Sequence, residues 1–245
     1  SNGINTGDAS NYNLLSTTGS TFSVSRATAS LTGLKVYDAN NTLTGTQLAI
    51  TGVTVGGTTQ TLNYTGSATL YDPNVATLNN YVTSSNLVLT NNGSYLANNY
   101  VLPAFTRNAN NSATVSAATA TVIANKTYDS DTTLSAGQVT ITGVSVNGTA
   151  QTLGFSGSAA LSDANVFMTN KYVNTSGMTL ADGSTGVASN YVLPASAYNA
   201  ASNTATISRF ALTATNVNTG SSVYGDPIAP GSVTFTNKFG TDDVN

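Results

Sequence analysis

Aspartate is the only acidic residue in this chain of 245 residues, which contains neither histidine nor cysteine. The usual general base, the thiol nucleophile and most zinc sites are therefore excluded. Paired carboxylates of the glycosidase kind remain. However, the aspartates that recur along the chain stand in turn-forming contexts, where Asp caps the turn: Asp38, Asp72, Asp129 and Asp163. The sequence predicts that the chain is not an enzyme.

Calcium is the metal that the remaining oxygen ligands suit best. The candidate ligands are Asp129 and Asp131, with Asn125 nearby, whereas the corresponding earlier segment has Asp38 followed by Asn40. No Asp-x-Asp-x-Asp-Gly loop is present, and the chain lacks the Glu that closes many calcium sites in a bidentate manner. We expect no obligatory cofactor and keep calcium at Asp129 and Asp131 as a hypothesis of weak binding.

An internal repeat organises these residues. Ile50-Thr51-Gly52-Val53 returns as Ile141-Thr142-Gly143-Val144, an offset of 91 residues, and 37–103 aligns with 128–194 without a gap at about half identity. A unit of this length is large enough to bury its own core, unlike the shorter units of solenoids. The chain is predicted to be an array of one domain type.

Domain boundaries are placed where a Ser-rich junction precedes each alternating strand. The predicted units are the end of a preceding repeat (1–24), a first repeat (25–115), a second repeat (116–207) and the start of a following repeat (208–245). The last segment departs from the others, because it carries Tyr-Gly at Tyr224 instead of Tyr-Asp.

The fold is predicted to be all-β. Short alternating runs recur every 8–12 residues between Gly, Asn, Asp and Ser, a pattern typical of sandwiches and barrels. We expect tandem Ig-like β-sandwich units in an elongated array. β-Grasp-like units or a β-helix are the alternatives.

A hairpin inside the repeat is the best-specified local structure. Gly56-Gly57 and, in the second repeat, Asn147-Gly148 suit the positive φ angles of a type I′ turn. With this two-residue loop, one face is predicted to be core in each repeat: Val53, Val55, Leu62 and Tyr64, then Val144, Val146, Leu153 and Phe155.

Two further residue types recur at the same offset. Lys35 returns as Lys126, which favours either a solvated lysine near a strand end or, less simply, a covalent Lys–Asn crosslink. The recurring tyrosines favour core packing with a bonded hydroxyl over a glycan-binding platform; they are Tyr37, Tyr81 and Tyr100, then Tyr128, Tyr172 and Tyr191.

Composition restricts the partners. Only 7% of the residues are charged, against about 25% in ordinary soluble domains. Seven basic residues and a net charge of −3 leave no cluster for nucleic acid. No apolar run is long enough to span a membrane. The absence of cysteine is typical of an exported protein that folds without oxidation.

The repeat resembles the YDG-type repeats of large bacterial surface adhesins, the filamentous-haemagglutinin-like proteins of two-partner secretion. The resemblance is carried by Tyr37-Asp38 and Tyr128-Asp129 at the start, and by Asn99-Tyr100 and Asn190-Tyr191, each followed by x-Leu, at the end. Ala39 and Ser130 stand where the motif has Gly. If that Gly holds a positive φ angle, we expect the turn here to differ.

The resemblance implies a secreted protein of the bacterial cell surface, with the repeats acting as a stalk that projects an adhesive region. Neighbouring repeats are the expected partners. Two alternatives stay open: the repeats bind a host glycan or matrix protein themselves, or they self-associate into extracellular fibres or biofilm matrix through exposed strand edges.

Overall fold

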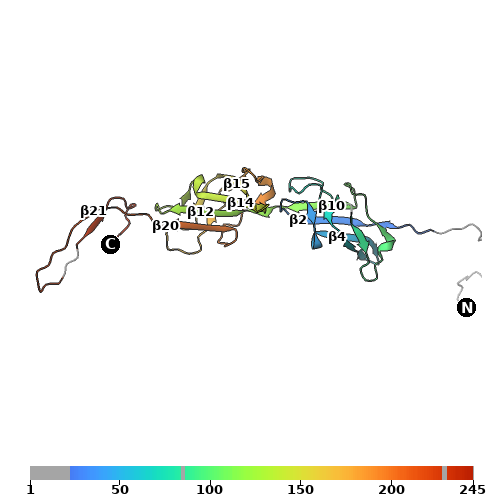
Figure 1. The fold of residues 1–245 in the computed structure, drawn as a ribbon, viewed down its shortest axis with the longest axis horizontal. Helices are drawn as coiled ribbons and strands as arrows, with labels where there is room; N and C mark the ends of the chain where they lie inside the picture. The colour runs from blue at the N-terminus through green and yellow to red at the C-terminus, as the bar shows by residue number, and fades with distance from the viewer. Residues whose placement is uncertain (1–22, 84–85, 228–230, 245) are drawn as a thin grey trace, which may run out of the picture.

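The computed structural model describes residues 23–83, 86–227 and 231–244, and it is an all-β structure whose only helices are single 3-10 turns within these ranges (Figure 1). The prediction of an all-β chain is confirmed. The segment predicted to end a preceding repeat lies outside the described residues as far as residue 22. No helix among the described residues has the length and apolar character needed to cross a membrane.

The first repeat is built around a four-stranded sheet in the order β10-β2-β4-β5. Its first and last long strands, β2 and β10, lie side by side and parallel, while β2–β4 and β4–β5 are antiparallel. Three small two-stranded pairs complete the unit: β1–β9, β3–β7 and β6–β8. The elements are β1 Ala27–Thr28, β2 Ser30–Val36, β3 Thr42–Leu43, η2 Gly45–Gln47, β4 Leu48–Val55, β5 Thr58–Thr61, β6 Asn63–Thr65, β7 Ala68–Thr69, β8 Val88–Thr90, η3 Ala97–Asn99, β9 Tyr100–Val101 and β10 Asn111–Ser116.

The second repeat has the same plan, with one long strand, β15 (Thr149–Gly157), in the place of β5 and β6. Its main sheet runs β18-β15-β14-β12-β20, with β12 and β20 parallel, beside a three-stranded sheet β13-β16-β17 and the pair β11–β19. The elements are β11 Ala118–Thr119, β12 Thr121–Thr127, β13 Thr133–Leu134, η4 Ala136–Gln138, β14 Val139–Val146, β15 Thr149–Gly157, β16 Ala159–Leu161, β17 Val173–Asn174, β18 Met178–Ala181, η5 Ala188–Asn190, β19 Tyr191–Val192 and β20 Asn203–Ser208.

A single antiparallel pair follows, formed by β21 (Ala214–Val217) and β22 (Val233–Phe235). Every strand pairing among the described residues joins strands within 27–116, within 118–208 or within 214–235. The three groups of strands follow one another along the long axis of the molecule (Figure 1). The two repeats are therefore arranged end to end and not side by side.

Each core forms on one face of the main sheet, because alternate residues of a strand point to opposite sides. On β2 the inward residues are Leu31, Gly33 and Lys35, and on β12 they are Val122, Ala124 and Lys126. Apolar side chains from β4 and β14 close these cores, including Ile50 and Ile141. A Cβ at Gly33 would lie 2.9 Å from Leu43 Cδ1, so that side chain would have to shift to admit the alanine that the second repeat has at Ala124.

In each core a buried asparagine side chain pairs with the backbone in the way that a neighbouring strand would. Asn111 Oδ1 accepts from the Val82 amide at 2.9 Å, and Asn111 Nδ2 donates to the Val82 carbonyl at 2.9 Å. Asn203 makes the same two bonds to Val173, each at 2.9 Å. The side-chain amide thus pairs with both backbone groups of one residue, as a peptide group of a neighbouring strand would.

The hairpin turn has the predicted geometry, but only part of the predicted core face is buried. Gly56 and Gly57 have φ of 59° and 83°, and Asn147 and Gly148 have 51° and 83°. Leu62 and Leu153 are buried as predicted, with Tyr64 and Phe155 partly so. However, Val53 and Val55 are 44% and 61% exposed, Val146 is 38% exposed and Val144 is partly buried. By the strand pairing, Val55 still lies on the face of Leu62 and Val146 on that of Leu153. They are exposed because the tip of the hairpin, 53–59 and 145–150, extends past the buried part of the unit.

The Tyr-Asp turn also differs from expectation. Ala39 and Ser130 have φ of 64° and 68°, so both take the left-handed conformation that Gly would hold. The turn is therefore kept, at a cost of about 1 kcal/mol for a non-glycine residue. Asp38 offsets part of this cost, because its carboxylate accepts from the Asn40 amide at 3.1 Å.

Candidate functional site

The contact surface between the two repeats brings three of the motif residues together, Tyr37, Asn190 and Tyr191. It consists of Tyr37 and the loop residues Asn74 and Val75 on the first repeat, and of Gln151, Asn190 and Tyr191 on the second. We call this surface the internal junction. The Tyr-Asp start of one repeat thus meets the Asn-Tyr end of the next.

Strand β2 delivers Tyr37 to the internal junction. The Tyr37 amide donates to the Ser116 carbonyl at 2.8 Å, which continues the parallel pairing of β2 and β10. Its ring meets the Tyr191 ring edge to face, with centroids 5.3 Å apart and planes at 81°, a favourable aromatic geometry. Tyr37 is 5% exposed. It is buried as predicted, but its ring and its hydroxyl contact the other repeat, at Tyr191 and Gln151.

Gln151 joins the two tyrosines. Its Oε1 accepts from the Tyr37 hydroxyl at 3.3 Å and from the Tyr191 hydroxyl at 2.5 Å. The Tyr191 oxygen in turn accepts from the Val144 amide at 3.0 Å. Burial raises the pKa of Tyr191, and the bond from Val144 opposes this effect. The hydroxyl therefore stays protonated and serves as a donor.

Asn190 forms the second half of the internal junction. Its Oδ1 accepts from the Val75 amide at 2.9 Å, and its Nδ2 donates to Asn74 Oδ1 at 2.8 Å. Both partners lie in the first repeat, and Asn190 is 0% exposed. Asn74 is oriented by Asp72, whose Oδ1 accepts from the Asn74 amide at 2.7 Å. The Asp72 carboxylate therefore caps a turn, as predicted, and that turn presents the docking loop.

The repeated Ile-Thr-Gly-Val segment makes room for these tyrosines. A Cβ at Gly143 would lie 2.2 Å from the Tyr191 hydroxyl oxygen, and one at Gly52 would lie 2.4 Å from that of Tyr100. Glycine is thus needed where the ring crosses the strand. A β-bulge at the same place aims the Val53 and Val144 amides at the tyrosine oxygens, at 3.2 Å and 3.0 Å.

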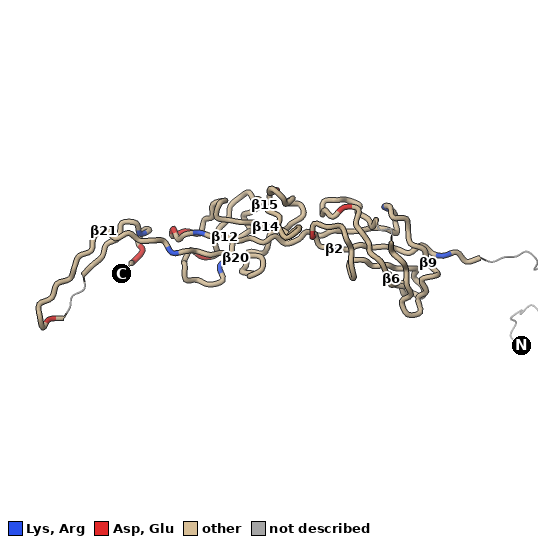
Figure 2. Tube along the Cα trace, viewed as in Figure 1, with Lys and Arg blue, Asp and Glu red and all other residues tan. Residues whose placement is uncertain are grey.

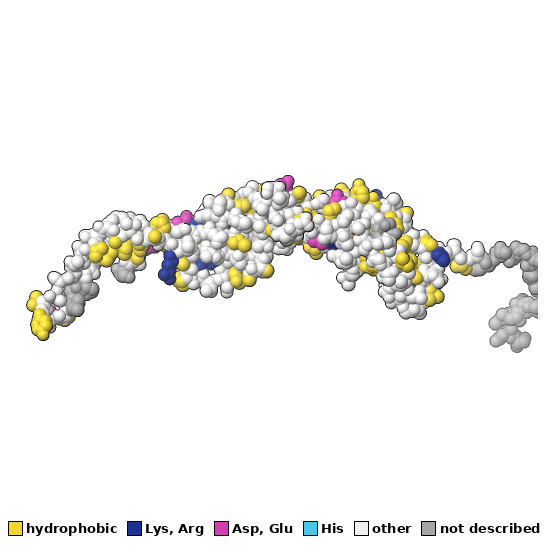
Figure 3. Space-filling model, viewed as in Figure 1, with side chains coloured by type: hydrophobic (Ala, Val, Ile, Leu, Met, Phe, Trp, Pro, Cys, Tyr) yellow, Lys and Arg dark blue, Asp and Glu magenta, His cyan; other side chains and the backbone are white. Residues whose placement is uncertain are grey.

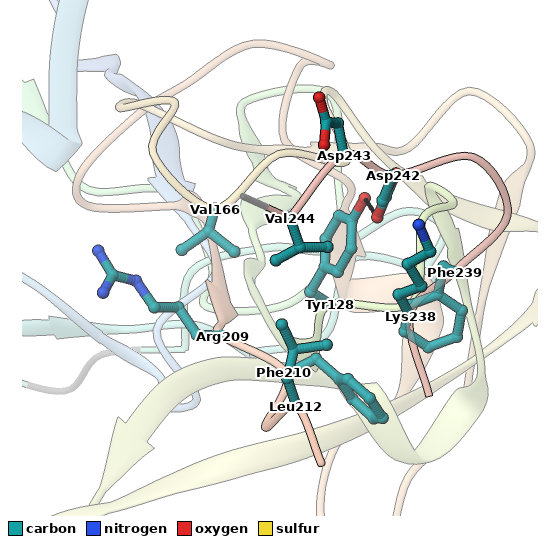
Figure 4. Close-up of a pocket in the computed structure, with 10 residues that line it drawn as sticks. All are labelled: Tyr128, Val166, Arg209, Phe210, Leu212, Lys238, Phe239, Asp242, Asp243 and Val244. Carbon is teal, nitrogen blue, oxygen red and sulfur yellow. Dashed lines mark hydrogen bonds between the residues drawn. The ribbon is translucent and has the colours of Figure 1, made fainter. Parts of the chain in front are cut away.

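A second junction links the second repeat to the strands that follow. Tyr128, the counterpart of Tyr37, donates from its hydroxyl to Asp242 Oδ2 at 2.9 Å and meets Phe239 edge to face at 5.8 Å (Figure 4). Its amide donates to the Ser208 carbonyl at 2.9 Å, as Tyr37 does to Ser116. The hydrogen bond to Asp242 raises the pKa of Tyr128.

Both repeated lysines are buried at the Tyr-Asp turn. Lys126 Nζ lies 2.7 Å from Asp129 Oδ1 and 2.5 Å from Asp131 Oδ1, and it donates to the Thr133 carbonyl at 2.6 Å. Lys35 Nζ contacts Asp38 Oδ1 at 2.9 Å, Asn40 Oδ1 at 2.7 Å and the Thr42 carbonyl at 2.6 Å. Each ammonium group therefore stabilises the turn whose oxygen atoms surround it.

This arrangement bears on the calcium and crosslink hypotheses. The cation that lies between the carboxylates of Asp129 and Asp131 is the Lys126 ammonium, and the described residues contain no group of three carboxylates, histidines or cysteines. Burial lowers the pKa of Lys126, but the hydrogen bonds to Asp129 and Asp131 outweigh it, so the pKa is raised. A crosslink needs an uncharged amine, which this environment disfavours. The solvated-lysine interpretation is wrong, because both lysines are 5% exposed.

The remaining recurrent tyrosine lies apart from the junction. Tyr81 stacks on Tyr71 with centroids 4.8 Å apart and planes at 16°, and Tyr71 is 60% exposed. Tyr172 has Ser162 in the place of Tyr71. This pair is therefore a feature of the first repeat only.

Charges are sparse over the whole described surface. Lys, Arg and Asp occur singly or in the small clusters at the turns (Figure 2), and the visible face is dominated by uncharged polar atoms with scattered apolar side chains (Figure 3). No extended charged or apolar patch is visible on this face to mark a ligand site. The junctions are the places where motif residues converge.

Stability near the Lys126 turn is expected to depend on pH. The hydrogen bond from Lys126, followed by that from the Thr133 amide, lowers the pKa of Asp131 below its ordinary value. The pKa of Asp131 is thus lower in the folded than in the unfolded state. Its contribution to stability is therefore complete above pH about 4 and is lost as pH falls through the folded-state pKa. The Asp131→Asn variant should therefore melt below the parent at pH 7 and converge with it in acid.

The first repeat supplies the matched control for this measurement, which is thermal unfolding from pH 7 down to pH 2. Asn40 stands where the second repeat has Asp131. Asn40→Asp should add the same acid-sensitive contribution. A constant difference between Asp131→Asn and the parent across this range would contradict the prediction.

Comparison with family models, curated proteins and solved structures finds no match for this chain.

Three junction residues are absent from the predicted site residues, namely Gln151, Asn74 and Val75, although Asp72-Pro73-Asn74-Val75 is one of the segments that carry the resemblance to the repeat family. Gln60 and Gln151 do recur at the 91-residue offset inside the repeated segment, as do Asn74 and Asn165. That recurrence of polar residues at one offset is the signal that could have pointed to them.

Proposed function

We propose that the chain is a structural spacer, in which consecutive repeats hold a fixed end-to-end arrangement. The observation that supports this most is the internal junction, where Tyr37, Gln151 and Asn190 give each repeat a bonded contact to its neighbour. A chain of domains joined only by flexible linkers would need no such contacts.

The class of protein proposed is a secreted bacterial surface adhesin of the YDG-repeat kind, with these repeats as part of its stalk. Three of the motif residues that carry the resemblance, Tyr37, Asn190 and Tyr191, lie at the internal junction. The sparse charge and the absence of cysteine fit export and folding outside the cell.

The fold of each unit is proposed to be β-grasp-like rather than Ig-like. Ig-type sandwiches consist of two antiparallel sheets. In both repeats the first and last long strands are adjacent and parallel, β2 with β10 and β12 with β20. This pairing supports the β-grasp-like alternative.

The spacer function can be tested on a cell surface. The full chain is placed between a surface anchor and a fluorescent reporter, and the mean height of the reporter above the membrane is measured by energy transfer to a membrane dye. We expect the chain carrying both Tyr37→Ala and Asn190→Ala to hold the reporter lower. Asn99→Ala is the matched control, since it changes the equivalent residue of the first repeat, which is exposed.

Ligand binding is the competing function, and the stacked Tyr71–Tyr81 pair is the surface that favours it. We expect the labelled chain to show no saturable binding on glycan arrays or matrix proteins. Saturable binding that Tyr71→Ala abolishes would overturn the spacer proposal. Analytical ultracentrifugation should give a monomer; concentration-dependent growth would instead support self-association into fibres.

A further inference from the structure

The end of the first repeat that faces away from the second carries the same residues that form the acceptor half of the internal junction. Gln60, Asn99 and Tyr100 correspond to Gln151, Asn190 and Tyr191 at the 91-residue offset. With Val53 and the entering chain they line a hollow of about 500 Å³; the other lining residues are Val24, Ser25, Arg26, Ala27 and Asn98.

The geometry of this end is already that of an acceptor. The Tyr100 hydroxyl lies 2.6 Å from Gln60 Oε1 and accepts from the Val53 amide at 3.2 Å. The corresponding bonds of Tyr191 are 2.5 Å and 3.0 Å. In the internal junction Gln151 Oε1 accepts a second hydroxyl, from Tyr37. A carbonyl oxygen has two lone pairs, so Gln60 can do the same.

Burial distinguishes the two ends. Asn190 is 0% exposed because the loop at Asn74 and Val75 covers it, whereas its counterpart Asn99 is exposed. Val53 is 44% exposed, whereas Val144 is partly buried. The residues are thus alike, and the difference is the neighbour that covers one set.

We infer that this end of the first repeat is a docking site for the Tyr-Asp tip and the Asp-x-Asn-Val loop of a further unit of the same kind. The incoming tyrosine hydroxyl bonds Gln60, its amide pairs with the Ser25 carbonyl as Tyr37 pairs with Ser116, and the incoming loop bonds Asn99. Arg26 lies beside the hollow, as Arg209 does beside Tyr128 at the second junction. A cation there suits a tip that carries an aspartate. The inference rests on the internal junction and does not depend on the spacer function.

The test uses the absence of tryptophan from the chain. A copy of residues 25–115 is placed directly in front of Ser25, which preserves the spacing of the natural junction. A single tryptophan replaces the tyrosine at position 37 of the added copy, and acrylamide quenching measures its exposure. We expect quenching several-fold weaker than for the exposed reference Tyr71→Trp, and equal to that of the buried reference Tyr37→Trp in the unextended chain.

A second measurement covers the case in which tryptophan does not fit the tyrosine pocket. Asn99→Ala should leave the unfolding temperature of the unextended chain unchanged and lower that of the extended chain, as Asn190→Ala does in both. Equal effects of Asn99→Ala in the two chains would overturn the docking site. So would strong quenching of the added tryptophan while the internal reference is protected.

Discussion

Replacing Asn203 by Ala is expected to destabilise the second repeat by about 3 kcal/mol, because three backbone groups lose their partner and a polar cavity is left behind. Those groups are the amide and carbonyl of Val173 and the carbonyl of Ala195, each 2.9 Å from the side chain. Asn203 is 0% exposed, so water cannot replace these bonds without opening the core. Denaturant unfolding followed by circular dichroism measures the loss.

The equivalent asparagine of the first repeat provides a second test of this prediction, and an exposed asparagine provides the control. Asn111→Ala should cost a similar amount, since Asn111 bonds Val82 twice and the Ala104 carbonyl at 3.1 Å. Asn98→Ala, at an exposed asparagine, should change the unfolding free energy by less than about 0.5 kcal/mol. Equal effects of Asn98→Ala and Asn203→Ala would show that the buried amides do not hold the strands together.

The sequence predicts the local part of this architecture well. The turn at Asn147-Gly148 depends on two residues whose φ preferences are known, and the repeat itself is visible by direct comparison. The alternation along Leu31, Gly33 and Lys35 also places the lysine on the inward face, although a lysine is rarely assigned to a core. Attention to that alternation would have predicted the buried ammonium.

The non-local part could not be predicted in the same way. The parallel pairing of β2 with β10 joins Leu31 to Asn111 across the whole repeat, and no local pattern encodes it. The role of Asn111 follows from that pairing. The bulge after Thr51 likewise depends on the Tyr100 ring crossing Gly52, a contact between distant segments.

The internal junction is hidden for a related reason. A tyrosine at a strand end is typical both of a core residue and of an interface residue, and Tyr37 is buried by Gln151 and Tyr191 from the next repeat. The two cases differ only in which chain segment supplies the contact.

Loss of the junction contacts is expected to release the two repeats from their fixed arrangement. Tyr37→Ala removes the edge-to-face pair and a buried ring, and Asn190→Ala removes both bonds to the docking loop. Together these changes should weaken the junction by about 2–4 kcal/mol. The covalent connection at 116–118 remains. We expect each repeat to stay folded, while the distribution of relative orientations of the two repeats becomes broader.

Spin-label distances between the repeats measure this directly, because the chain has no native cysteine. Cysteines at Thr58 and Thr149, both exposed and at equivalent positions beside the hairpin turns, carry the labels. The parent should give one narrow distance distribution and the Tyr37→Ala, Asn190→Ala chain a broad one, with Asn99→Ala as the unchanged control. A narrow distribution in the double variant would mean that the connecting strands alone fix the orientation, and the Tyr-Asp and Asn-Tyr motifs would then need another explanation.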